Sequence, residues 1–139
     1  MGSYEFFDHV ADVGIRVRAD SIEDLFVTAA LGLTAWIGPP PEGGTREDRM
    51  WIEAEYPEEL LVRWLQEILC HFHLQHAYVT GVKELHLDVE RCTLEALLLS
   101  RTWEDAMRGE YQEVKAVTYH QLKIEQRGGA WLAAVILDI

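Results

Sequence analysis

The sequence predicts an α+β fold in which two helices pack on one face of a mostly antiparallel sheet, as a two-layer sandwich. Two observations support this: two amphipathic stretches at helical spacing, and a run of four strand-like segments after the second. A chain of 139 residues has the usual length of one compact domain. We therefore expect a single domain over residues 1–139, and keep open that it comprises two related strand–helix–strand halves.

The first elements are an extended segment and a helix. Residues 4–18 have an extended pattern, which is interrupted at residues 12–14. Ser21 is a favourable N-cap, and Asp24 follows three residues later, as in a capping box. These signals predict a helix over residues 22–36, because apolar side chains recur along one face of that stretch.

The second helix has the strongest amphipathic pattern in the chain. Before it, residues 39–49 are rich in Pro, Gly and charge and predict an exposed loop, and residues 50–54 predict a short strand. Pro57 suits the first turn of a helix. The apolar residues that then recur at helical spacing are Leu60, Leu61, Trp64, Leu65, Ile68, Leu69 and Phe72. We expect this stripe to face the core rather than to line a ligand groove.

The last part of the chain is expected to be mostly strand, because apolar and polar residues alternate there. The expected strands cover residues 82–89, 93–100, 117–125 and 131–139. The first two can pair as a hairpin, and Gly128-Gly129 can supply the positive φ angles of a tight turn between the last two. The polar segment at residues 103–113 predicts a loop, where functional groups tend to concentrate.

The charge balance excludes one class of function. The chain has 24 acidic and 12 basic residues, for a formal net charge of −12. A protein that grips phosphate backbones needs clustered Lys and Arg, and the sequence contains no such cluster. We expect no direct nucleic-acid binding. A basic protein partner or a cation is electrostatically favoured.

The location and the redox state of the protein also follow from composition. No apolar run approaches the roughly 20 residues that a membrane helix needs, and the first residues lack the features of a secretory signal. We expect a soluble, cytoplasmic protein without membrane contact. Cys70 and Cys92 form no metal-binding pattern and are too few for a disulfide scaffold. Both are expected to be buried, reduced thiols.

Two carboxylates flank the predicted strand break near the N-terminus. Asp8 and His9 precede Asp12, and Gly14 can allow a tight backbone there. A hard cation such as Ca²⁺ or Mg²⁺ prefers carboxylate and carbonyl oxygens, often from an irregular loop. Asp-rich turns also occur simply because they cap the backbone. The segment alone leaves both interpretations open.

The last strand ends in Asp138-Ile139, which places a carboxylate beside the terminal carboxyl group. An apolar strand that runs to the last residue indicates that this end is held in the sheet. If the first and last strands are neighbours, Asp12 and Asp138 converge on one cation, which would offset the repulsion between them. The alternative is a solvated, charged chain end.

The remaining candidate functional residues, mostly histidines, are better suited to contacts with a partner or to structural roles than to catalysis. His71, His73 and His76 cluster near the end of the second helix, but no pair has the i, i+4 spacing of helical zinc sites. Lys115 and His120 lie near a loop–strand junction and are candidates for a contact site, with purely structural roles as the alternative. No G-x-S-x-G elbow, P-loop or G-x-G-x-x-G fingerprint is present, so no enzyme activity is indicated beyond metal-assisted hydrolysis.

Four segments together resemble the archease family. They are FDHVADVGI at residues 7–15, ELLVRWL at residues 59–65, VKAVTYH at residues 114–120 and VILDI at residues 135–139. They occur in the family's order and span nearly the whole chain. Each segment alone is weak evidence for the resemblance, but the four together are specific to the family. Val10 is a departure, because the family usually has Thr there, and any hydroxyl contact made at that position is lost.

The resemblance implies that the protein activates an RtcB-type RNA-splicing ligase, the GTP-dependent enzyme that joins tRNA exons. Archease-like proteins promote the guanylylation and multiple turnover of that ligase without being catalysts themselves, and are more loosely described as chaperone-like. The family's metal site carries over to Asp12, to Asp138 and to a main-chain oxygen of Ile139. The divalent metal is expected to be Ca²⁺, with Mg²⁺ and Mn²⁺ as alternatives. His9, Lys115 and His120 are the candidates for partner contact.

Two other classes of function stay open. A metal-dependent phosphoester hydrolase would use Asp12, Asp138 and His9 to activate a water molecule. A general folding helper would instead bind exposed apolar segments of unrelated proteins, and would need no metal.

Overall fold

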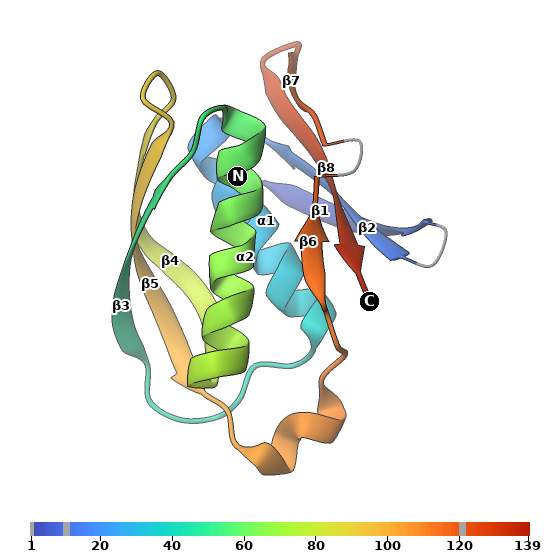
Figure 1. Ribbon diagram of the computed structural model, residues 1–139, viewed down its shortest axis with the longest axis vertical. Coiled ribbons are helices and arrows are strands. Elements are labelled where there is room, and N and C mark those ends of the chain that lie inside the picture. The colour runs from blue at the N-terminus through green and yellow to red at the C-terminus, as the bar shows by residue number, and fades with distance from the viewer. Residues whose placement is uncertain (1, 10–11, 120–121) are drawn as a thin grey trace.

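The computed structural model describes residues 2–9, 12–119 and 122–139 and has three layers, with two helices between two antiparallel sheets (Figure 1). In chain order the elements are β1 (Ser3–His9), β2 (Asp12–Ala19), α1 (Ile22–Ile37), β3 (Arg46–Glu53), α2 (Pro57–Gln75), β4 (Ala77–Asp88), β5 (Thr93–Thr102), the short 3₁₀ helix η1 (Asp105–Glu110), β6 (Ala116–Thr118), β7 (Ile124–Arg127) and β8 (Ala130–Asp138). The predicted α+β class with antiparallel pairing is confirmed.

The two sheets are built from different parts of the chain. The large sheet has the order β1-β2-β8-β6, and β7 also pairs with β8. It therefore joins strands from the two ends of the chain, with β8 running between β2 on one side and β6 and β7 on the other. The small sheet has the order β3-β5-β4 and comes from one continuous stretch.

The prediction of a single sheet is therefore wrong, because the two helices are buried on more than one side. α1 contacts β2 of the large sheet and β4 of the small sheet, and α2 contacts β4 and β6. Ala30 and Thr34 of α1 are buried although both lie outside its expected apolar face, which runs through Leu25, Ala29 and Leu33. A helix that is buried nearly all round needs cover on two sides, which one sheet cannot supply.

A buried hydrogen bond joins the two helices in the middle layer. The Trp64 side chain of α2 is fully buried, and its indole N–H donates to the main-chain oxygen of Phe26 in α1 at 2.8 Å. Phe26 is itself fully buried. A large aromatic side chain whose polar atom has a partner can fill the centre of a core without a desolvation penalty. The apolar stripe predicted for the second helix is confirmed as core.

Local sequence signals correctly placed the helix starts and the last turn. The Ser21 hydroxyl oxygen accepts a hydrogen bond from the main-chain N–H of Asp24 at 3.1 Å, so Ser21 is the N-cap of α1. Pro57 is the first residue of α2. Gly128 and Gly129 have φ angles of 55° and 82° in the turn between β7 and β8.

Other boundaries differ from the expected ones. β3 begins at Arg46, within the predicted loop, and its charged first half is compatible with an edge position. β4 begins at Ala77, earlier than expected, because it continues directly from the end of α2. The strand expected at residues 117–125 is instead two short strands, β6 and β7, and the expected loop before them contains η1.

The two thiols lie in different environments. Cys92 is buried, as expected, but Cys70 is exposed. Cys70 lies on the solvent side of α2, seven residues after Arg63 and three after Glu67, so it belongs to the polar stripe and not to the apolar one. In the described part of the chain, no helix is long and apolar enough to cross a membrane.

Removing the Trp64 side chain should destabilise the whole fold. Trp64→Ala leaves a cavity between both sheets and removes the hydrogen bond to Phe26, so we expect a loss of about 3–5 kcal/mol in the free energy of unfolding. Urea denaturation measures this loss. Trp51→Ala is the matched control, because Trp51 is 58% exposed and should change stability by no more than about 0.5 kcal/mol. A loss below about 1 kcal/mol for Trp64→Ala would contradict the packing described above.

Candidate functional site

The candidate metal ligands meet at one end of the large sheet. Asp12, the first residue of β2, lies directly opposite Asp138, the last residue of β8. The row continues on both sides, because His9 of β1 is opposite Asp12 and Ala116 of β6 is opposite Asp138. Residues from four strands, two near each end of the chain, are therefore neighbours in one row.

Both carboxylates lie on the sheet face that points away from the helices. Val13, Ile15 and Val17 of β2 are buried against the middle layer, so Asp12 belongs to the opposite face. Residues directly opposite each other in antiparallel strands share a face, with Cβ atoms about 4.5–5.5 Å apart. Asp12 is half-buried and Asp138 is exposed, so solvent reaches this pair.

The segment before β6 is tied to the same strand end. The main-chain N–H of Lys115 donates to the main-chain oxygen of Asp138 at 2.7 Å. The Gln66 side chain of α2 donates to the main-chain oxygen of Val117 at 2.7 Å, which fixes β6 against the helix layer. The structure thus brings Lys115, a predicted contact residue, next to the carboxylate pair. His120, a second predicted contact residue, lies outside the described residues, as does Val10.

Gly14 is needed in this hairpin for a different reason from the one expected. It has no positive φ angle and lies in the regular register of β1 and β2. A Cβ atom at Gly14 would come within 2.1 Å of the Phe7 ring, so the glycine makes room for that ring against the sheet. Arg16 also packs on Phe7, with its guanidinium carbon 4.5 Å from the ring centroid, and pairs with Glu5 at 2.6 Å.

Few side chains at this end of the large sheet could bind a cation. Among residues 2–9, 12–119 and 122–139, no three His, Cys, Asp or Glu side chains are grouped closely enough to hold a metal ion. Asp12 and Asp138 provide two carboxylates on neighbouring strands, and Ile139 follows Asp138 directly. This is an all-oxygen donor set, which suits hard cations such as Ca²⁺ and Mg²⁺.

The histidines near the end of α2 have structural contacts. His76 ends the helix with a φ angle of 54°, and its ring lies 4.1 Å from Trp103 and 3.4 Å from the Asp105 carboxylate. Hydrogen bonds from Arg108 and His76 lower the pKa of Asp105. The His73 ring contacts the main-chain oxygen of Val114 at 3.2 Å. His73 and His76 therefore hold the segment around η1 against the end of α2.

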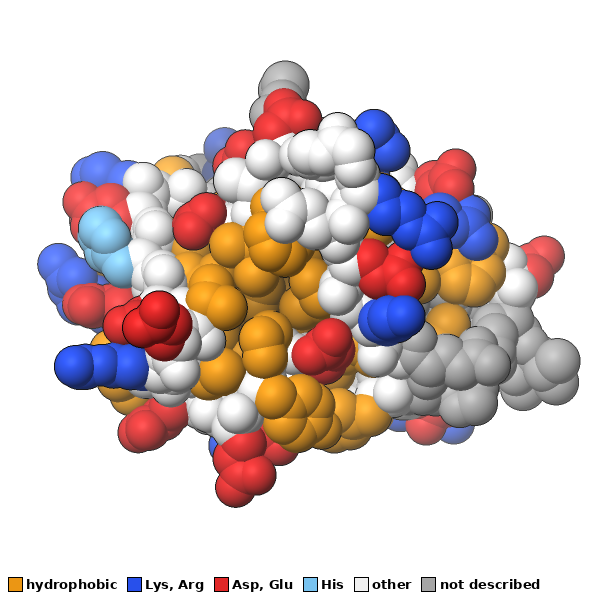
Figure 2. All heavy atoms as spheres, turned by 90° about the horizontal axis from the view of Figure 1, so that it is seen from above, with side chains coloured by type: hydrophobic (Ala, Val, Ile, Leu, Met, Phe, Trp, Pro, Cys, Tyr) orange, Lys and Arg blue, Asp and Glu red, His pale blue; other side chains and the backbone are white. Residues whose placement is uncertain are grey.

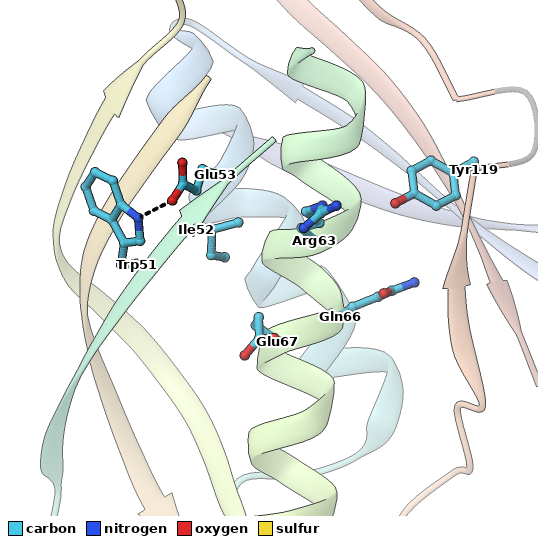
Figure 3. A pocket seen from close by; sticks show the side chains of 7 residues that line it. All are labelled: Trp51, Ile52, Glu53, Arg63, Gln66, Glu67 and Tyr119. Atoms are coloured by element: carbon cyan, nitrogen blue, oxygen red, sulfur yellow. Dashed lines mark hydrogen bonds between the residues drawn. The ribbon is translucent and has the colours of Figure 1, made fainter. Parts of the chain in front are cut away.

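A groove on the exposed side of α2 was not anticipated from the sequence. It has a volume of about 440 Å³ and runs along α2 between β3 and the end of β6 (Figure 3). Its lining residues are Trp51, Ile52, Glu53, Arg63, Gln66, Glu67 and Tyr119. The available signal was the polar stripe of the second helix together with Trp51, an aromatic residue between two inward-facing positions of the strand.

The sequence and the fold can be compared with those of known proteins. A model of the archease protein family (MTH1598/TM1083) matches residues 4–139. The chain belongs to the archease family. Proteins named archease from Saccharolobus islandicus and Methanosarcina mazei are 35% and 30% identical to it. The aligned parts cover 100% of this chain and 100% of the first relative, and 98% and 95% for the second.

Solved structures of archease-like proteins share the fold. The solution structure of Methanobacterium thermoautotrophicum protein 1598 has a TM-score of 0.72 and 26% identity, and 98% of each chain is covered. A crystal structure of a Thermotoga maritima archease, described as a possible chaperone, has a TM-score of 0.64 and 22% identity, with 96% of this chain and 94% of that chain covered. At that identity, the second likeness concerns the fold alone.

The close approach of Phe7 to Gly14 makes a testable prediction about the hairpin of this archease-family protein. Gly14→Ala should displace the Phe7 ring and lower the free energy of unfolding by about 1–3 kcal/mol. Gly81→Ala is the matched strand control, because the nearest atom to its added Cβ is Leu99 Cδ1 at 3.8 Å. That change should be neutral or stabilise by up to about 1 kcal/mol. Equal losses for the two variants in urea denaturation would contradict this account.

Proposed function

We propose that this chain is a non-catalytic activator of an RtcB-type, GTP-dependent RNA ligase, and that it promotes guanylylation and multiple turnover in tRNA exon ligation. Support comes from membership of the archease family and, above all, from the direct opposition of Asp12 and Asp138 at the end of the large sheet. In this proposal a divalent cation binds to these two carboxylates and to the main-chain oxygen of Ile139.

The donor set favours Ca²⁺ over softer metals, with Mg²⁺ and Mn²⁺ as alternatives. Ca²⁺ takes six to eight oxygen ligands, more than two carboxylates and one carbonyl provide. The remaining positions are then filled by water or by oxygen atoms of a partner. A bound cation also offsets the repulsion between two carboxylates held on neighbouring strands.

An activator of this kind works through protein contact. A formal net charge of −12 opposes RNA, so delivery of the substrate is electrostatically disfavoured. To promote guanylylation, the protein must bind one state of the ligase more tightly than another, because equal affinity for both shifts nothing. The main-chain N–H of Lys115 is hydrogen-bonded to Asp138, so Lys115 is next to the proposed cation site and can contact the ligase there.

A second candidate function, a general folding helper, is favoured by one surface. Figure 2 shows the end of the molecule at which both helices begin, where apolar side chains gather in the middle and charged side chains surround them. Tyr56, before α2, is 48% exposed, and Val89, in the turn after β4, is 43% exposed. Apolar surface of this kind can bind unfolded segments.

Calorimetric titration with CaCl₂ tests the metal site. The wild type should bind one Ca²⁺ per chain, and Asp12→Asn and Asp138→Asn should each weaken binding by at least about tenfold, because each removes a charged ligand. Asp20→Asn is the control, since Asp20 lies just beyond the other end of β2. Unchanged affinity in both site variants would remove this pair from consideration as ligands.

A ligase turnover assay tests the function itself. The wild type, added to the RNA ligase of its own organism, should increase both guanylylation and multiple-turnover sealing, and should turn over no RNA phosphoester alone. Asp138→Asn should stay folded, as circular dichroism can verify, yet lose most of the stimulation, whereas Asp20→Asn should retain it.

Each alternative outcome of that assay has a definite meaning. A folded Asp138→Asn protein that stimulates like the wild type would disprove the metal-dependent mechanism. Hydrolysis of phosphoesters by the isolated protein would favour the metal-dependent hydrolase. Suppression of the aggregation of an unrelated protein in the presence of EDTA, without any effect on the ligase, would favour the folding helper.

A further inference from the structure

The edge of β3 is an unpaired strand edge beside a groove. Within the described residues, β3 pairs with β5 alone, so its other edge carries main-chain groups that face away from the small sheet. The first half of the strand, Arg46 to Arg49, is charged, which protects an edge against random pairing. The second half, from Met50 to Glu53, is mostly apolar and borders the groove along α2.

The groove includes the main chain of this edge. Three consecutive residues, Trp51, Ile52 and Glu53, line it. Successive side chains of a strand point to opposite faces, so side chains alone cannot place all three in one groove. Ile52 is also only 5% exposed, so its side chain points into the core. The groove therefore follows the edge of β3, with Arg63 and Glu67 of α2 beside it (Figure 3).

The surroundings of Trp51 are acidic. The indole N–H of Trp51 lies 3.5 Å from the Glu53 carboxylate, two residues along the same face. Glu95 of β5 is directly opposite Trp51 and also belongs to that face. Arg49, 3.6 Å from Glu95, partly balances these charges. Arg63, which borders the groove from α2, pairs with Glu59 at 3.6 Å. An exposed indole beside two carboxylates suits a cationic side chain, which is attracted both by the ring face and by the negative charge.

We propose that the edge of β3 over residues 50–53 binds an extended segment of a partner protein that carries Lys or Arg at alternate positions. The segment adds a strand to the small sheet through main-chain hydrogen bonds. One of its basic side chains lies against Trp51, between Glu53 and Glu95. The surplus of acidic residues on this protein favours such a partner over an acidic one. The inference does not rest on the proposed ligase function or on the metal site.

Two synthetic peptides test this proposal on the full chain. One nine-residue peptide alternates Lys and Val, and its counterpart alternates Glu and Val. The Lys peptide should slow hydrogen exchange of main-chain amides within residues 50–53 and should bind at least about tenfold more tightly than the Glu peptide, by fluorescence anisotropy. Trp51→Ala should weaken its binding by about two- to fivefold. Glu53→Lys combined with Glu95→Lys should weaken it further.

The controls separate this surface from others. Leu74→Ala changes another exposed apolar residue, 81% exposed on α2, and should leave peptide binding unchanged. Calcium binding should also be unchanged in Trp51→Ala, so failure here and failure of the metal site are distinguishable. Equal binding of the two peptides, or unaltered exchange at residues 50–53, would overturn the proposal. Slowed exchange that depends on protein concentration without peptide would also overturn it, in favour of pairing between two copies of this chain.

Discussion

Both sheets of this protein depend on one buried pair of helices. Trp64 fills the centre of that pair, and its bond to the Phe26 carbonyl fixes how the helices pack against each other. Since α1 and α2 each contact strands of both sheets, any change in their packing shifts the two sheets relative to each other. The candidate site belongs to the large sheet and the groove follows the edge of the small sheet, so the helix pair determines the spacing between these two surfaces.

The placement of β8 determines the chemistry of the large sheet. Because β2 pairs with β8 along the whole length of β2, the register that puts Val135 opposite Ile15 in the core also puts Asp138 opposite Asp12 at the end. A slip by one residue would turn the apolar side chains to the wrong face, so core burial itself holds the two carboxylates together. Repulsion between them is small beside the free energy of burying that many apolar residues.

The features that could be predicted from the sequence depend on local chemistry. Ser21, Pro57 and the paired glycines mark helix starts and a turn, and the structure confirms them. The approach of Asp12 to Asp138 could be stated only on the condition that two distant strands are neighbours, which is a question of topology. The second sheet could not be predicted, because small and polar residues of α1 are buried by tertiary packing.

The exposure of Cys70 could not be predicted either, because Cys70 lies where the polar stripe of α2 adjoins the apolar one. The metal itself stays a prediction.

The central position of β8 has a consequence for synthesis on the ribosome. The stretch from β3 to β5 is continuous and can assemble its small sheet and α2 as soon as it emerges. The β1–β2 hairpin emerges earlier, yet it gains its second neighbour only when β8, the last strand, has been made. During that interval the edge of β2 that later pairs with β8 has no partner strand. Pairing between such distant segments is slow, so the nascent chain keeps an open, aggregation-prone strand edge until β8 has emerged and paired with β2.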